Sequence, residues 1–586
     1  MRGIITLCLL LISVQFFAQV GIGTTNPEGA LDVVTTNNTG FVMPRVTTVD
    51  AVTDGNGNPP VDGTMVFDTT LGMPCVYTNG KWACFGFDSS GAAVVYDGTP
   101  PPFSANYIKA SNTDAQDQFG NNVFLSSDGT TMAIAAPRER SAATGIDGDQ
   151  TSNLMANSGA VYIFINTAGT WSQQAYLKAS NTGTGDFFGR SIGLSGDGNT
   201  LVVGAHLEDS NATGIGGSQT DNSAANSGAV YIFDRSGTTW SQTAYVKASN
   251  TEAGDRFGQS VDISADGNTI AVGAPFEPSN ATGIGGDQTN NLTPASGAVF
   301  IFTKTAGVWS QQEYIKSSNS ENGDFVGGHV SISSDGNTLL VGANGEDGNT
   351  TGVNGIETDN SFTSAGAAYV FSRSGTTWSQ QAYLKQSNTE AGDFFGYTVT
   401  LSDDGNTAAI AAPEEDSAAF GIDGVQTDNS AIGAGAVYVF VRVAGVWSQD
   451  AYVKASNTNT DDTFSSNGIA LSDDGSILIV GAYSEDSSAT GIDGVETDNT
   501  AADAGAAYVY QKSGTWSQLN YVKASNTDAG DGFGGYNLQG YNLVSMNNDG
   551  SLFIIGAPFE ASNATGIGGD QANNAAFNAG AVYVFD

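Results

Sequence analysis

The chain has 586 residues, 77 of them glycine, and 60 Asp and Glu against 19 Lys and Arg give a net charge of −41. Such a charge excludes partners that require a basic surface, namely nucleic acids and anionic membranes. Short apolar runs separated by Gly, Asn, Asp, Ser and Thr predict an all-β protein with many turns.

The first 18 residues, MRGIITLCLLLISVQFFA, have the pattern of a signal peptide. Arg2 supplies the positive start, residues 3–17 supply the apolar stretch, and Ala18 is a small residue suited to cleavage. No later segment approaches the ~20 apolar residues that a membrane span needs. We therefore expect the mature chain to be exported, to the periplasm, the cell surface or the medium, and not to cross a membrane.

Residues 19–90 lack the repeat that fills the rest of the chain and are expected to form a small β-rich module. The segment opens QVGIGTTNPEGALDV and continues through GFVMPRV. It resembles a short β-rich module found at the start of many secreted bacterial proteins, which implies attachment or assembly rather than chemistry. Residues 91–105 follow, with three consecutive prolines that indicate a stiff linker.

The stretch CVYTNGKWAC, residues 75–84, predicts a β-hairpin. Asn-Gly is the strongest signal for a two-residue type I′ turn. Counting outward from that turn pairs Cys75 with Cys84 at a separation that a disulfide can bridge. We expect this disulfide because such bonds persist in exported proteins, and two free thiols are the alternative.

From residue 106 to residue 586 the sequence repeats with a step of 69 residues, seven times. The second copy contains four strand candidates, FGRSIGLS, TLVVGAH, GAVYIF and WSQTAYVKAS, and the short connections GDGN and DRSGTT predict an antiparallel meander. The runs LVVGA and AVYIF are continuously apolar, which is typical of strands buried on both faces. Seven such sheets predict a seven-bladed β-propeller, and a parallel β-helix is the less suitable alternative.

The repeated pattern FG, SxDGNTxxVGAP and GAVYxF is similar to the FG-GAP repeat of integrin-α-type propellers. The glycine of FG would let the innermost strand approach its neighbours near the axis. The pattern varies in the fourth copy, with Val326-Gly327, and in the sixth, with Phe464-Ser465. The seventh copy carries an insertion, GYNLQGYNLVSMNN.

The seventh copy stops after its third strand, so ring closure requires a strand from elsewhere. The missing fourth strand occurs at the start of the repeat region as NYIKASN, residues 106–112. We predict that it pairs with residues 581–585, with residues 91–96 as a possible competitor. A lysine recurs in every fourth strand, and we expect it at the exposed outer edge of the blade, where it would prevent edge-to-edge pairing. These lysines are Lys109, Lys178, Lys247, Lys316, Lys385, Lys454 and Lys523.

Two acidic residues recur in each copy, and both are predicted at the same end of the blade. The aspartate lies in the loop that enters strand one, and the glutamate lies in a loop of about 22 residues that leaves strand two. Adjacent carboxylates repel unless a cation or hydrogen-bond donors relieve them, so these pairs are candidate Ca²⁺ ligands. The alternative is that they accept backbone N–H groups and pin the loops. The residues are Asp117, Glu139, Asp186, Glu208, Asp255, Glu277, Asp324, Glu346, Asp393, Glu415, Asp462, Glu485, Asp531 and Glu560.

Integrin-type blades often carry calcium in the first hairpin, but SGDGNT and its copies hold too few acids for that motif. Catalytic patterns are also lacking: no GxSxG, HExxH or phosphate-binding loop occurs, and His206 and His329 do not recur. The interpretation is a secreted binding or adhesion protein that meets a protein or glycan ligand on an acidic long-loop face. The alternatives are an extracellular lyase or hydrolase that uses carboxylates in the central funnel, and a purely structural surface component.

Overall fold

The computed structural model describes residues 20–22, 31–33, 45–46, 64–68, 73–78, 81–87, 93–96, 106–536 and 541–586. The signal peptide predicted at residues 1–18 lies outside the described residues. The chain divides into two compact units, Met1–Pro101 and Pro102–Asp586. In the part of the chain that the structure describes, no helix has the length and apolar character needed to cross a membrane.

The N-terminal unit contains two small sheets. The first is a parallel pair, β1 (Val20–Ile22) and β2 (Leu31–Val33). The second sheet has five strands in chain order, namely β3 (Arg45–Val46), β4 (Met65–Asp68), β5 (Met73–Thr78), β6 (Lys81–Phe87) and β7 (Ala93–Tyr96).

The predicted hairpin of this unit is confirmed as the pair β5–β6, with Thr78 opposite Lys81 and Cys75 opposite Cys84. The bond between the two cysteines stays a prediction. One expectation is wrong: residues 93–96, assigned to the linker, form β7, which pairs antiparallel with β6. These four residues therefore belong to the N-terminal sheet, and they do not compete for a place in the seventh blade. The rest of the predicted linker, residues 91–92 and 97–105, lies outside the described residues.

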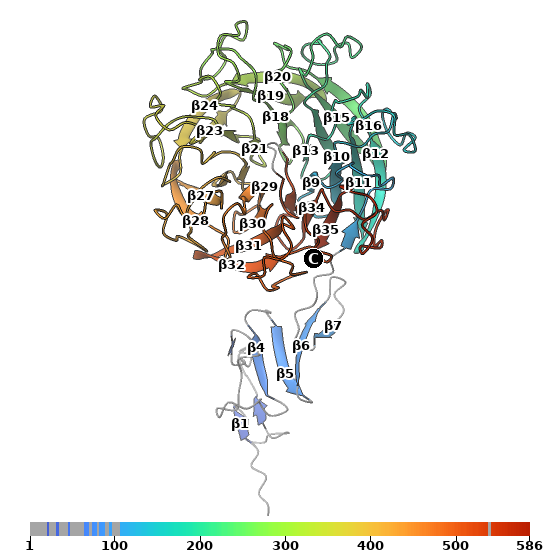
Figure 1. Cartoon of the computed structure of the whole chain (residues 1–586), viewed down its shortest axis with the longest axis vertical. Coiled ribbons are helices and arrows are strands. Elements are labelled where there is room, and N and C mark those ends of the chain that lie inside the picture. The colour runs from blue at the N-terminus through green and yellow to red at the C-terminus, as the bar shows by residue number, and fades with distance from the viewer. Residues whose placement is uncertain are drawn as a thin grey trace, which may run out of the picture. The chain divides into compact units, whose positions relative to one another are not determined.

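The second unit is a seven-bladed propeller in which each blade is a four-stranded antiparallel sheet around a central axis (Figure 1). The first three blades are β9 (Asn122–Leu125), β10 (Thr131–Ala136), β11 (Ala160–Thr167), β12 (Thr170–Leu177); β13 (Ser191–Leu194), β14 (Thr200–Ala205), β15 (Ala229–Ser236), β16 (Thr239–Val246); and β17 (Ser260–Ile263), β18 (Thr269–Ala274), β19 (Ala298–Thr305), β20 (Val308–Ile315). The next three are β21 (Val330–Ile332), β22 (Thr338–Ala343), β23 (Ala367–Ser374), β24 (Thr377–Leu384); β25 (Val399–Leu401), β26 (Thr407–Ala412), β27 (Ala436–Val443), β28 (Val446–Val453); and β29 (Phe464–Leu471), β30 (Ile477–Ala482), β31 (Ala506–Ser513), β32 (Thr515–Val522).

The seventh blade is built from both ends of the propeller sequence, as predicted. Its strands are β33 (Val544–Met546), β34 (Phe553–Ala557), β35 (Ala581–Phe585) and β8 (Asn106–Ile108). Tyr583 of β35 lies opposite Tyr107 of β8 in an antiparallel register. The ring is therefore closed by main-chain pairing between segments more than 450 residues apart in sequence.

The second and third strands are buried on both faces because each blade is covered by its neighbours. All six residues of β14 are buried, for example. The apolar clusters combine adjacent blades: Ile163 and Leu177 of the first blade pack with Leu201 and Tyr231 of the second. Burial of this kind supplies the main driving force for folding.

The FG glycine permits the close approach that the sequence predicts. Gly258, at the entry to the third blade, has φ +84°, and a Cβ there would lie 2.7 Å from the carbonyl oxygen of Ala229. A side chain would therefore collide with the preceding blade in a conformation that already favours glycine.

The hairpin ends of the seven innermost strands are joined by a closed ring of backbone hydrogen bonds. Each ring residue donates its N–H to the carbonyl oxygen of its counterpart in the next blade, at 2.9–3.1 Å. The ring holds this end of every blade in the same relation to its neighbour. Its members are Ser127, Gly196, Ala265, Ser334, Asp403, Asp473 and Asn548.

Candidate functional site

Each blade contains a buried ion pair at its long-loop end. In the second blade, Lys247 Nζ lies 2.9 Å from Glu208 Oε2, and both side chains are almost fully buried. The same pair recurs in all seven blades at 2.7–3.0 Å. The pairs are Lys109–Glu560, Lys178–Glu139, Lys247–Glu208, Lys316–Glu277, Lys385–Glu346, Lys454–Glu415 and Lys523–Glu485.

The expectation that these lysines are exposed at the outer edge is therefore wrong. The long loop of each blade folds back along the end of its fourth strand and covers that edge. In the second blade the N–H of Lys247 donates to the carbonyl oxygen of Gly214 at 2.8 Å, and Gly216 donates to Tyr245 at 2.8 Å. The edge is protected by the chain's own loop, and the lysine side chain turns inward to the glutamate.

The glutamate is saturated with donors besides the lysine. Glu208 Oε1 accepts hydrogen bonds from the Tyr245 hydroxyl at 3.0 Å and from Asn181 Nδ2 at 2.9 Å. Its Oε2 accepts the N–H of Ser210 at 3.1 Å. Tyr245 lies on the fourth strand, Asn181 on the connection into the blade and Ser210 on the long loop. The glutamate thus fastens three segments together.

The recurring aspartates lie close to these glutamates and pin the entry loop. Asp186 Oδ2 accepts the N–H of Gly183 at 2.8 Å. Burial raises the pKa of Asp186 to about 7, and the negative charge of Glu208 acts in the same direction. The other six aspartates also accept the N–H three residues earlier, at 2.7–3.2 Å, and have pKa values raised to about 7 or about 8, chiefly by burial.

Loop pinning, the alternative to calcium binding, is therefore present in every blade. The lysine also supplies the positive charge that a cation would bring to the carboxylates. Among the described residues, no group of three or more His, Cys, Asp or Glu side chains has the geometry of a metal site. Calcium at these pairs stays a prediction.

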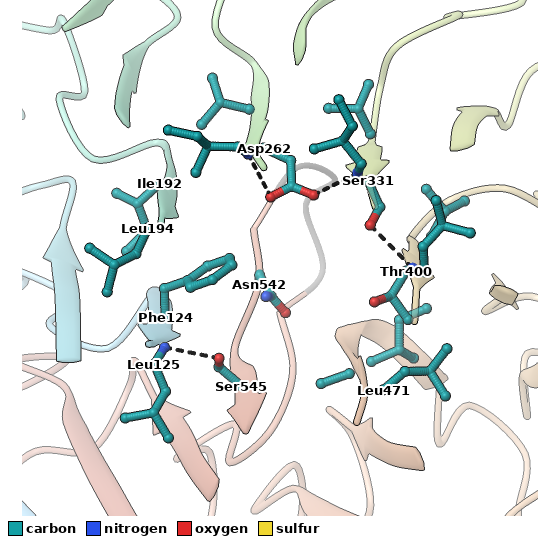
Figure 2. Close-up of a pocket in the computed structure, with 18 of the residues that line it drawn as sticks. Phe124, Leu125, Ile192, Leu194, Asp262, Ser331, Thr400, Leu471, Asn542 and Ser545 are labelled. Carbon is teal, nitrogen blue, oxygen red and sulfur yellow. Dashed lines mark hydrogen bonds between the residues drawn. The ribbon is translucent and has the colours of Figure 1, made fainter. Parts of the chain in front are cut away.

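The innermost strands of the seven blades enclose an axial channel (Figure 2). Its cavity volume is about 150 Å³, well below the roughly 300–1,000 Å³ of typical ligand pockets. Side chains link neighbouring strands around it: Ser545 Oγ accepts the N–H of Leu125 at 3.0 Å, and Asp262 Oδ2 accepts the N–H of Ile332 at 2.8 Å. The channel is therefore mainly a packed centre that joins the blades.

Carboxylates do occur in this channel, as the enzyme alternative requires. Burial raises the pKa of Asp262 to about 7, although two backbone N–H groups hold it in place. Asp403 and Asp473 lie beside each other in the backbone ring, where burial and then the charge of Asp403 raise the pKa of Asp473 to about 7. Neither histidine pairs with them: burial lowers the pKa of His329 to about 4, and that of His206 well below its usual range.

The seven long loops carry exposed apolar side chains. Leu154 is 84% exposed, Phe420 71% and Phe577 65%. Every long loop has at least one such residue, although its base is held by the buried ion pair. The exposed set in these loops is Leu154, Ile215, Leu292, Ile356, Phe420, Val425, Ile432, Val495, Ile567 and Phe577.

A group of residues at the axial end of this face was not predicted from the sequence. Arg190 follows the FG dipeptide of the second blade, and its guanidinium carbon lies 3.6 Å from the centre of the Tyr541 ring. Tyr541 belongs to the insertion in the seventh blade. The insertion was the available signal for Tyr541, because it sets the seventh copy apart from the others. Arg190 gives no such signal, because the residue after FG differs from copy to copy, for example Asn121, Gln259 and Tyr397.

Comparison with known proteins agrees with this architecture. The model of the FG-GAP repeat family matches residues 171–233, 240–302 and 378–440. A second family model, described as a phage tail like trimerisation region, matches residues 21–94. No curated protein matches the chain.

Several solved structures are similar to this chain at low identity. They include the Cps50 (Swd1) β-propeller domain of Myceliophteria thermophila, at 9% identity and a TM-score of 0.43 over 82% of this chain and 98% of that one. Hydrazine synthase of Kuenenia stuttgartiensis and the periplasmic gluconolactonase PpgL of Pseudomonas aeruginosa each match at 13% identity over 76% of this chain and 93% of theirs, with TM-scores of 0.40 and 0.39. These likenesses carry no argument about function.

Proposed function

We propose that this chain, a β-propeller protein built from FG-GAP repeats, is an exported binding protein that holds a protein or glycan ligand on its long-loop face. Loops on a rigid scaffold are the usual place for binding residues, because they can vary without disturbing the core. Export follows from the pattern of residues 1–18.

The observation that carries the proposal is the set of exposed apolar side chains on all seven long loops. Exposed apolar groups that recur on one face are typical of interaction surfaces. The loops that bear them are anchored by the buried Lys–Glu pairs, so little ordering entropy is lost when a partner binds. A purely structural role would not require apolar groups on these loops.

The N-terminal unit would assemble the propellers. Residues 21–94 match the phage tail like trimerisation region, and we propose that they bring three chains together. Three linked binding faces would raise the avidity for a repetitive ligand without any new contact. Light scattering of the mature chain should then give about three times the mass of one chain.

The binding proposal is tested with the mature chain on glycan arrays and bacterial or host surface proteins. The ligand that binds most tightly in these screens is then used to compare variants. Replacing both Phe420 and Phe577 by Ser should weaken its binding by roughly tenfold or more, since buried aromatic side chains contribute much of the binding free energy of an interface. Replacing Val308 and Val446 by Ser is the matched control, because both are exposed, at 67% and 69%, but lie on the outer hairpins. Equal effects of the two double variants would refute a long-loop binding face.

A further inference from the structure

The basic residues of the propeller fall into three groups. Sixteen Lys and Arg lie between residues 106 and 586. Seven are the buried lysines, and five more lie over tryptophan rings at the outer hairpins, as Arg442 does over Trp447 at 5.3 Å. The remaining four are on the long-loop ends of the first three blades, in a chain of net charge −41. They are Arg138, Arg140, Arg190 and Arg256.

Two of these arginines converge next to the axis. Arg190 is the residue after FG in the second blade, and Arg256 is the residue before FG in the third. Ser191, the residue after Arg190, donates its hydroxyl to the carbonyl oxygen of Gly258, two residues after Arg256, at 2.9 Å. The segments that carry the two arginines are therefore in contact. Burial lowers the pKa of the Arg256 guanidinium, and the positive charge of Arg190 acts in the same direction.

Aromatic rings surround both guanidinium groups. Arg256 lies 4.1 Å from the centre of the Phe276 ring, and Phe276 meets Phe325 edge-on at 5.3 Å. Arg190 lies over Tyr541 at 3.6 Å. Cations over aromatic faces are held in a fixed orientation. Phe276 and Phe325 are half-buried, so parts of their rings face solvent.

A buried polar atom lies in the same cluster. His206 is 8% exposed and packs against Phe187, and among the described residues its Nδ1 has no hydrogen-bond partner. Burial, then the charges of Arg190 and Arg256, lower the pKa of His206 well below its usual range, so the ring is neutral near pH 7. A neutral imidazole nitrogen can donate to or accept from a hydroxyl group. Buried polar atoms in proteins are almost always hydrogen-bonded, so the Nδ1 atom of His206 is a candidate to bond a ligand.

We propose that Arg256, His206, Phe276 and Phe325 of this axial cluster bind a carboxylated saccharide such as a uronate unit. Arg190 and Tyr541, at 4% and 3% exposed, belong to the buried support of the cluster and do not contact the ligand. The Arg256 guanidinium suits a carboxylate, the half-buried rings suit the apolar face of a sugar, and the imidazole suits a hydroxyl. In a chain of net charge −41, a group of basic residues is a favourable place for a carboxylate. This inference rests on the proposed long-loop binding face and names its ligand class.

The test is calorimetric titration of the mature chain with tri-galacturonate at about 0.15 M salt, where long-range attraction is largely screened. The wild-type chain should bind it, and the fully methyl-esterified trisaccharide should not. Arg256→Gln should weaken binding by roughly tenfold or more, as expected for loss of a charge-assisted contact. Arg256→Lys should be intermediate because it keeps the charge but not the bidentate geometry.

The matched control is Arg442→Gln, which removes the same charge from an outer hairpin and should leave affinity unchanged. Thermal melts of all variants establish that they are folded. Equal binding of the methyl ester, an unaltered affinity of Arg256→Gln, or equally tight binding of a glutamate tripeptide would each overturn the inference. If tri-galacturonate does not bind, but the Phe420 and Phe577 replacements still abolish binding of another ligand, the long-loop proposal stands and the uronate site does not.

Discussion

The two ends of each blade use carboxylates in opposite ways. At the hairpin end, Asp197 is exposed and accepts hydrogen bonds from Ser195 Oγ at 2.7 Å and the N–H of Asn199 at 3.0 Å. Burial is the largest single influence on its pKa and raises it, but these hydrogen bonds and one from Asn199 Nδ2 at 2.8 Å together outweigh burial and lower the pKa. At the long-loop end, Asp186 is buried beside Glu208 and its pKa is raised to about 7. The hairpin acid stabilises a turn while remaining hydrated, whereas the buried acids fasten a long loop at a cost in solvation.

This difference predicts a pH dependence, the largest effect that we expect. A carboxyl whose pKa is raised on folding binds its proton more tightly in the folded state, so stability falls as pH rises from about 4, the unfolded value, to about 7–8. A rise of one pKa unit corresponds to about 1.4 kcal/mol in the free energy of unfolding, and the pKa of each of the seven aspartates is raised. Denaturant unfolding at pH 5 and pH 8.5 measures it.

Replacement of single acids separates the two ends. Asp186→Asn should reduce the loss of stability between these pH values, because the amide stays neutral. Asp197→Asn should leave that loss unchanged and lower stability equally at pH 5 and pH 8.5. A carboxyl with a lowered pKa stabilises the fold above its unfolded pKa of about 4 and loses that effect only as the pH falls below it. If Asp186→Asn follows the wild-type profile between pH 5 and pH 8.5, the buried aspartate does not contribute as described.

Breaking one buried ion pair should have the next largest effect. Lys247→Met leaves Glu208 buried and unpaired, and we expect a loss of about 3–5 kcal/mol in the free energy of unfolding. Lys304→Met is the matched control, because its pair with Asp234 is only partly buried, and it should cost less than about 1 kcal/mol. Similar losses in the two variants would show that the buried pair has no special role.

The N-terminal hairpin offers a covalent counterpart to these ion pairs. Cys75 and Cys84 lie opposite each other on β5 and β6, and we expect them to be linked in the exported chain. Mass spectrometry of a non-reduced digest should find the linked peptides. Cys84→Ser should destabilise this unit by about 2–3 kcal/mol through loss of a short cross-link. Two thiols that react with alkylating agent in the native protein would contradict the prediction.

The smallest expected effect is a change in melting temperature on removal of calcium from the acidic pairs, because the lysines already neutralise part of the charge of these carboxylates. If a cation binds there, the melting temperature should be lower in chelator than in calcium at matched ionic strength. Replacing Asp186 and Glu208 together by Asn and Gln should remove about one blade's share of that difference. Identical melting curves in the two solutions would leave the carboxylates as anchors of the loops.

The repeat made much of the fold predictable. The 69-residue step predicts seven blades, and NYIKASN supplies the fourth strand that the seventh copy lacks. The Asn-Gly turn gives the register of Cys75 with Cys84 by simple counting. These inferences succeed because strand alternation, turn chemistry and repeat length are properties of neighbouring residues.

The lysine of the fourth strand shows where such reasoning fails. Lys247 and Glu208 are 39 residues apart, and both recur, but nothing in the spacing shows that a loop brings them into contact. The residues of the axial cluster are even farther apart in sequence, since Arg190 of the second blade contacts Tyr541 of the seventh. The sequence by itself determined the number of blades, their strand order and their closure. Only the tertiary structure decided which charges are buried together and which residues meet near the axis, because those contacts depend on loop paths and ring closure rather than on local periodicity.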